Sequence, residues 1–138
     1  MQGLRSIAAV VAGFGFMVST VMVGTIVAAR LFLPAGVPAG AAAVPGAYLA
    51  ASLALSFVGA VVGGWLAARI GNAAPMAHAS ALAVVTIVLA VAAARSPAPG
   101  PQPAWYAVAV GVMGAAGALA GGKLRAAAAA APGAGVVA

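Results

Sequence analysis

Residues 45–68 read PGAYLAASLALSFVGAVVGGWLAA, a run without a single charged side chain. An α-helix rises about 1.5 Å per residue, so about 20 apolar residues cross the roughly 30 Å hydrocarbon core of a bilayer. The run lacks the strict alternation of apolar and polar residues that marks a membrane β-strand. Within lipid, a single segment satisfies all its backbone groups only as a helix, so we predict a transmembrane helix over residues 45–68.

Three more uncharged runs of similar length follow the same pattern, at residues 7–29, 75–94 and 103–122. Arginine, proline and glycine separate them, and these residues mark loops between spanning helices. The sequence therefore predicts an all-α membrane protein with four transmembrane helices arranged as two helical hairpins. We expect one membrane domain over residues 1–138, with a short C-terminal tail over residues 123–138. An alternative is that residues 126–131 extend the fourth helix until Pro132-Gly133 stops it.

The first run has an alternative interpretation as a cleaved secretory signal. Arg5 would form its basic start, and Val27-Ala28-Ala29 resembles a cleavage site. The apolar part of a signal peptide is usually about 7–15 residues long, and this run is longer. We therefore favour a spanning helix.

The composition supports a surface that faces lipid. Apolar residues make up 66% of the chain and charged residues 4%, and there is no Asp, Glu or Cys. A soluble domain is nearer half apolar and a quarter charged. The absent carboxylates and thiols exclude a carboxylate acid–base pair and a thiolate metal site. We predict that the protein is not an enzyme. Because its cations are isolated at the edges of apolar runs, we expect no nucleic-acid partner.

His78 is the one histidine of the chain, and it lies in the first turn of the third predicted helix. One histidine is too few ligands for a zinc site, so we expect no metal. The plain interpretation is a polar residue at headgroup level, and we expect no cofactor. The alternative is an axial ligand for haem or a chlorin, with a partner subunit supplying the second ligand.

The short connections on one side of the membrane carry more Lys and Arg than those on the other. Such an excess marks the cytoplasmic side, so we predict both termini in the cytoplasm. The heavy use of Ala, Gly, Val and Pro suggests a GC-rich bacterial genome, so we expect the membrane to be a bacterial inner membrane. One side holds Arg5, Arg69, Lys123 and Arg125, and the other holds Arg30 and Arg95.

The second and fourth runs resemble each other. Shifting residues 45–68 by 58 positions aligns them with residues 103–126, and nine of the 24 pairs are identical. Tyr48 then meets Tyr106, and Gly63-Gly64 meets Gly121-Gly122. The match favours two hairpins related by an axis along the membrane normal, as a parallel internal repeat.

Both runs also carry small residues on one helical face, including two GxxxG spacings. Small residues let helix backbones approach closely in lipid, so we expect these faces to pack against helices of the chain or of a partner. The second run contributes Ser52, Ser56, Gly59 and Gly63, and the fourth contributes Gly111, Gly114, Gly117 and Gly121.

Several segments of the chain resemble uncharacterised small four-helix bacterial inner-membrane proteins. The resemblance implies a fold and a membrane location, and it brings no activity with it. The segments are residues 5–7 (RSI) through 13–14 (GF), 63–69 (GGWLAAR), 75–79 (PMAHA), 103–106 (PAWY) and 121–125 (GGKLR).

We therefore expect a structural or accessory subunit of a larger membrane complex, with membrane lipids and other membrane subunits, or further copies of itself, as partners. One alternative is a homo-oligomeric channel or carrier for a small neutral or anionic solute. Another is a membrane protein that binds a lipid or a cofactor.

Overall fold

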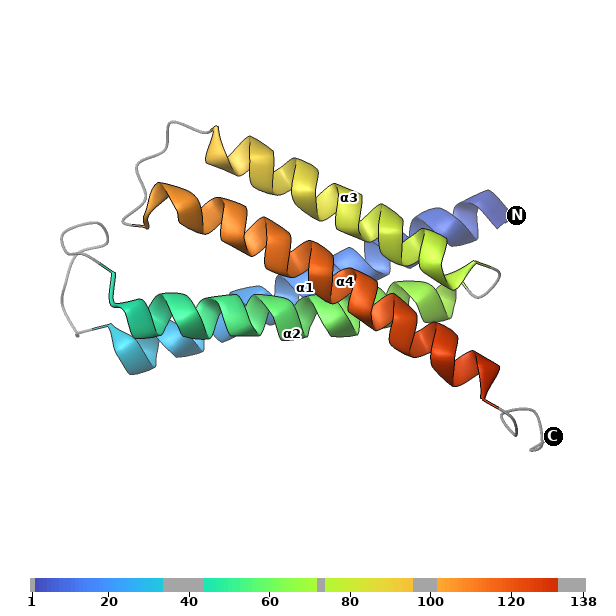
Figure 1. Cartoon of the computed structure of the whole chain (residues 1–138), viewed down its shortest axis with the longest axis horizontal. Helices are drawn as coiled ribbons and strands as arrows, with labels where there is room; N and C mark the ends of the chain where they lie inside the picture. Colours follow the sequence, from blue (N-terminus) through green and yellow to red (C-terminus); the bar gives the residue numbers. More distant parts are fainter. Residues whose placement is uncertain (1, 34–43, 72–73, 96–101, 132–138) are drawn as a thin grey trace.

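A computed structural model of the chain describes residues 2–33, 44–71, 74–95 and 102–131. It is all-helical in these ranges, and each helix is long and apolar enough to cross a membrane, which confirms the predicted fold class. The helices are α1 (Gln2–Phe32), α2 (Gly46–Ile70), α3 (Pro75–Ala94) and α4 (Ala104–Ala130) (Figure 1).

The helix ends differ from the predicted ends, except in α3, which spans the predicted residues. The largest difference is at the C-terminal end of α4, which continues through Lys123 and Arg125 to Ala130. Residues 123–130 are therefore helical where the prediction placed a tail, in keeping with the alternative that residues 126–131 extend the fourth helix. Lys and Arg end an apolar run but are good helix formers, and alanine is the best. The rest of the predicted tail, from residue 132, lies outside the described residues.

Helices α2 and α4 form the centre of the structure. They begin at the same end and cross each other, while α1 packs on α2 and α3 packs on α4 (Figure 1). Between α1 and α4 there are no close backbone contacts among the described residues. The two hairpins therefore meet mainly through their second helices, in the parallel sense that the internal repeat predicts.

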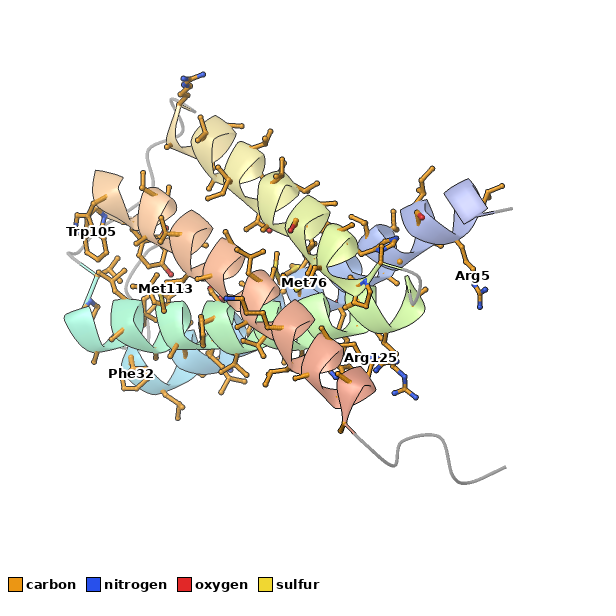
Figure 2. All side chains as sticks on the ribbon, turned by 45° about the vertical axis from the view of Figure 1, so that its right-hand side comes forward. Arg5, Phe32, Met76, Trp105, Met113 and Arg125 are labelled. Carbon is orange, nitrogen blue, oxygen red and sulfur yellow. The ribbon has the colours of Figure 1, made fainter. Side chains whose placement is uncertain are left out.

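The two ends of the structure differ in their side chains. Arg5 and Arg125 lie at one end, and Phe32 and Trp105 lie at the other (Figure 2). We call the first the basic end, because it also holds Arg69 of the last turn of α2. We call the second the tyrosine end, because Tyr48 and Tyr106 begin their helices there and share one buried cluster.

Small residues fill the interior and large apolar residues face outward. Ala60, Ala67 and Ala118 are completely buried, whereas Leu82 is the one large side chain that is fully buried in the described part. Ile7 and Val88 are examples of large side chains that are mostly exposed. Lipid tails are as apolar as leucine, so hiding large side chains gains little in a membrane.

Candidate functional site: helix seams and the lateral cleft

The seam between α1 and α2 is centred on two glycines that face each other. A Cβ atom placed on Gly63 would lie 2.7 Å from the Gly13 carbonyl oxygen, and one on Gly13 would lie 2.7 Å from the Gly63 carbonyl oxygen. One turn away, a Cβ on Gly59 would lie 3.3 Å from the Cβ of Thr20. The two backbones therefore touch at the Gly13–Gly63 crossing and leave no space for a side chain.

The seam between α2 and α4 is equally close. A Cβ on Gly117 would lie 2.7 Å from the Phe57 carbonyl oxygen. One turn further along α4, a Cβ on Gly121 would overlap the Val61 carbonyl oxygen and lie 2.6 Å from the backbone nitrogen of Trp65. Because these neighbours are backbone atoms, they cannot rotate away as the end of a side chain can.

The glycines of α4 that we expected on one face are divided between two neighbouring helices. Gly117 and Gly121 face α2, whereas Gly111 and Gly114 face Ala90 and Thr86 of α3. At 100° per residue these positions do share a broad face, but α4 lies between α2 and α3 and the face meets both.

The chain's own helices bury the whole set of predicted packing residues. These residues are Ser52, Ser56, Gly59, Gly63, Gly111, Gly114, Gly117 and Gly121. Gly13 was missing from the prediction. The available signal in the sequence was the four-residue spacing of Ala9, Gly13 and Met17 along α1. All three residues are buried in the structure.

The internal repeat holds for topology but not for individual contacts. Gly63 faces α1 and Gly64 faces α4, so the repeat predicts that Gly121 faces α3 and Gly122 faces α2. Instead Gly121 faces α2, and Gly122 faces Ala79 of α3. In each Gly-Gly pair, one glycine faces each of the two neighbouring helices, but the order of the two glycines is reversed between α2 and α4.

The buried hydroxyl groups bond mostly to their own helices. Ser56 Oγ donates to the Ser52 carbonyl oxygen at 2.8 Å, and Thr86 Oγ1 donates to the Leu82 carbonyl oxygen at 2.9 Å. The Ser52 hydroxyl group is buried and has no partner at hydrogen-bonding geometry. The phenol group of Tyr106 is nearby and would be the partner of such a hydrogen bond. These contacts form no continuous polar path along the described interior.

His78 is turned back toward the α2–α3 connection. Its Nδ1 atom lies 2.8 Å from the Ala74 carbonyl oxygen, and its ring packs against the backbone of Gly71. The ring also borders a shallow groove between α1 and α3. No group of three or more His, Cys, Asp or Glu that could hold a metal ion occurs among the described residues.

A second hollow, the lateral cleft, lies between α1, α3 and α4 on the half nearer the tyrosine end. Its volume is about 360 Å³, and it is lined mainly by apolar atoms. It exists because α1 follows α2, away from α3, so that α1 and α3 diverge toward the tyrosine end (Figure 1). Its walls include Phe14 and Met17 of α1 and Leu89 and Ala93 of α3.

The described helices thus form a small integral membrane protein with closed seams and a cleft open to the side. The expected resemblance to small four-helix bacterial inner-membrane proteins stays a prediction. No protein-family model, curated protein or solved structure matches this chain.

Proposed function

We propose that this protein is a structural or accessory subunit of a larger membrane complex. The observation that carries the proposal is the lateral cleft, an apolar hollow between three helices that opens toward the surrounding bilayer. Phe14 and Met17 form one wall and Leu89 and Ala93 form the other. A few side chains of a partner's transmembrane helix would fill this space and touch both of its walls.

The interior supports this proposal over a channel or carrier. Transport of a polar solute needs polar or ionisable groups along the span. Here Ser56 and Thr86 bond to their own helices, and backbone contacts close both central seams. Lateral packing is the activity that such a structure leaves available. That the glycine spacings stabilise the fold is part of this proposal, and the variants discussed below test it.

A photo-cross-linking amino acid in the cleft tests the proposed partner contact. At Leu89, which lines the cleft, we expect a discrete heavier protein adduct in native membranes. At Val58, which is also exposed but lies on α2 outside the cleft, we expect none. Lipid adducts alone at both positions would contradict the proposal. An adduct of twice the chain's mass would favour a homo-oligomer instead.

We also propose that the protein lies in a bacterial inner membrane with its basic end toward the cytoplasm. Arg5, Arg69, Lys123 and Arg125 lie toward the basic end, against Arg30 and Arg95 toward the other. Basic residues near short loops favour the cytoplasmic side.

Reporter fusions after Ala138 check this orientation. We expect activity from a reporter that folds in the cytoplasm, such as green fluorescent protein, and none from alkaline phosphatase. Alkaline-phosphatase activity at that end would reverse the topology.

A further inference from the structure

The shallow groove between α1 and α3 opens near the basic end of the structure. Its volume is about 590 Å³. The polar side chains of its lining, Ser6 and His78, lie close to the basic-end starts of α1 and α3. Residues further along these helices, Val10, Val11 and Ala81, give the groove an apolar lining. We call this hollow the histidine groove. It is polar at headgroup depth and apolar toward the centre of the bilayer.

A hydrogen bond of Nδ1 fixes the role of each nitrogen in the His78 ring. Nδ1 lies 2.8 Å from the Ala74 carbonyl oxygen. A carbonyl oxygen only accepts hydrogen bonds, so Nδ1 is the donor and carries a proton. In the neutral ring the second nitrogen, Nε2, then carries a lone pair and is an acceptor.

This acceptor is open to the groove. Nδ1 and its two bonded neighbours are the ring atoms closest to a Cβ placed on Gly71, so Nε2 belongs to the opposite edge. Among the described residues Nε2 has no hydrogen-bonding partner. In the same part of the chain, Ser52 Oγ is the one completely buried side-chain nitrogen or oxygen without a partner, so Nε2 is not sealed inside the protein. Only 9% of His78 is exposed, and the hollow that the residue lines is the histidine groove.

The position and chemistry of Nε2 indicate the kind of occupant. The helices are long enough to span a bilayer, so a groove at their basic-end starts lies beside lipid headgroups. An acceptor there selects a headgroup that donates. A hydrogen bond from a charged donor is roughly twice as strong as one from a neutral donor, which favours an ammonium group over a hydroxyl group. A zwitterionic headgroup has no net charge, so the basic end does not repel it.

We propose that the histidine groove binds phosphatidylethanolamine. Its ammonium group donates a hydrogen bond to Nε2 of His78, and its glycerol and upper acyl chain lie along Val10, Val11 and Ala81. The choline headgroup has the same charges but no N–H group, so phosphatidylcholine cannot make this bond. The groove is separate from the lateral cleft, so a lipid in it neither requires nor excludes a partner subunit.

Lipid titration of the purified full chain in a mild neutral detergent tests the site. Native mass spectrometry would count bound lipid for phosphatidylethanolamine, its N,N-dimethyl form and phosphatidylcholine, all with the same acyl chains. These headgroups differ in the number of N–H donors and share one net charge. We expect retention to fall in that order, by about tenfold between the first and the last, as for the loss of one hydrogen bond to a charged group.

Variants of His78 separate the acceptor from the shape of the ring. His78→Asn keeps a short amide that reaches the Ala74 carbonyl oxygen but has no atom at the place of Nε2, so the preference for phosphatidylethanolamine should disappear. His78→Gln is longer and carries an amide oxygen near that place, so it should keep most of the preference. Ser80→Ala is the matched control, because Ser80 is an exposed polar residue of α3 that does not line the groove. Thermal unfolding without lipid verifies that each variant is intact.

A second variant tests the groove without changing the histidine. Ala81 is exposed and lines the groove, so Ala81→Leu should fill it without overpacking the protein and weaken the retention of phosphatidylethanolamine. Ala94→Leu makes the same change at an exposed position of α3 outside the groove and should leave retention as in the parent.

Four results would overturn the proposal. The first is equal retention of phosphatidylethanolamine and phosphatidylcholine by the parent. The second is a preference in His78→Asn that equals that of the parent. The third is a loss in His78→Gln or Ser80→Ala as large as in His78→Asn, because the acceptor would then not decide the binding. The fourth is unchanged retention in Ala81→Leu, which would place the lipid elsewhere.

Discussion

The Gly121→Leu variant should lose most of its abundance in the membrane and unfold at a much lower temperature than the parent. A Cβ alone would overlap the Val61 carbonyl oxygen, and a leucine adds three more carbon atoms at the centre of the α2–α4 seam. Overpacking typically costs about 1–3 kcal/mol, and we expect a cost at or above the upper end because the neighbouring atoms are backbone. Membrane abundance and thermal unfolding in detergent measure the effect.

Gly15→Leu is the matched control for this prediction. Gly15 is exposed on α1, and nothing lies within 4 Å of a Cβ placed there. The same chemical change should therefore be nearly silent, as should Val88→Leu on the exposed face of α3. If Gly121→Leu accumulates and unfolds like Gly15→Leu, the α2–α4 seam is not as close as described.

Gly13→Ala and Gly63→Ala should each be strongly destabilising, yet the double variant should cost clearly less than the sum. Each new methyl group would lie 2.7 Å from the opposite backbone oxygen, so either one forces α1 and α2 apart. Once the helices have separated, the second methyl group finds space. Residues in contact commonly show coupling energies of about 0.5–3 kcal/mol, and we expect a value within that range.

Unfolding by sodium dodecyl sulfate in mixed micelles measures the free energy of unfolding of the parent, the two single variants and the double variant. The pair Gly15→Ala and Gly63→Ala serves as the control cycle, because Gly15 faces open space. Those two changes should add without coupling. Equal additivity in both cycles would mean that Gly13 and Gly63 do not meet.

The sequence was sufficient to predict the number of spans and the pairing of the hairpins. Apolar length is set by the bilayer, so runs such as 75–94 translate directly into helices. The end of α4 was mispredicted because Lys123 and Arg125 mark the membrane boundary rather than the end of a helix, and the alanines after them continue it.

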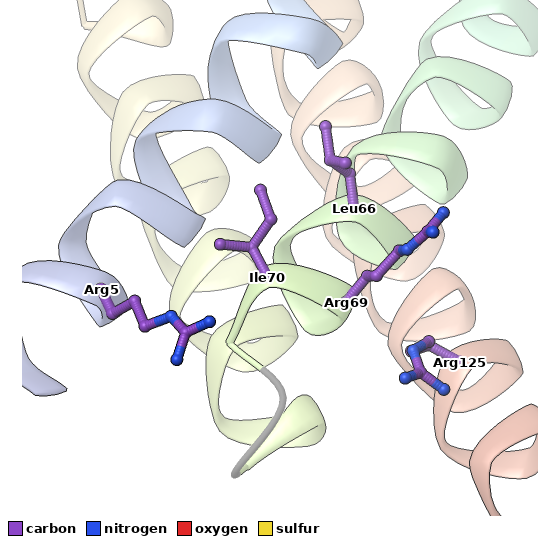
Figure 3. Close-up of a pocket in the computed structure, with 5 residues that line it drawn as sticks. All are labelled: Arg5, Leu66, Arg69, Ile70 and Arg125. Carbon is purple, nitrogen blue, oxygen red and sulfur yellow. The ribbon is translucent and has the colours of Figure 1, made fainter. Parts of the chain in front are cut away.

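The partners of the small residues could be predicted only in part. Helical spacing places Gly59 and Gly63 on one face, and α1 covers that face. Spacing does not say which neighbour a face meets, so the division of the α4 glycines between α2 and α3 needed the fold. The hollow lined by Arg5, Arg69 and Arg125 needed the fold too, because these residues belong to three helices and no local pattern links them (Figure 3).

A disulfide between Thr20→Cys and Gly59→Cys tests most directly how α1 packs on α2. In the structure α1 of the same chain, rather than a second chain, covers the face of α2 that carries Gly59 and Gly63, which we call the glycine face. The chain has no native cysteine, so any disulfide reports this pair alone. A Cβ on Gly59 would lie 3.3 Å from the Thr20 Cβ, close to the 3.5–4.5 Å that a disulfide usually spans.

Mild oxidation in the membrane, followed by electrophoresis without reductant and by thiol labelling, reads out the result. We expect a band at the monomer position with both thiols protected from labelling, and free thiols in each single-cysteine variant. A band at the dimer position, or thiols that stay fully reactive after oxidation, would contradict it. In either case α1 of the same chain would not cover the glycine face of α2.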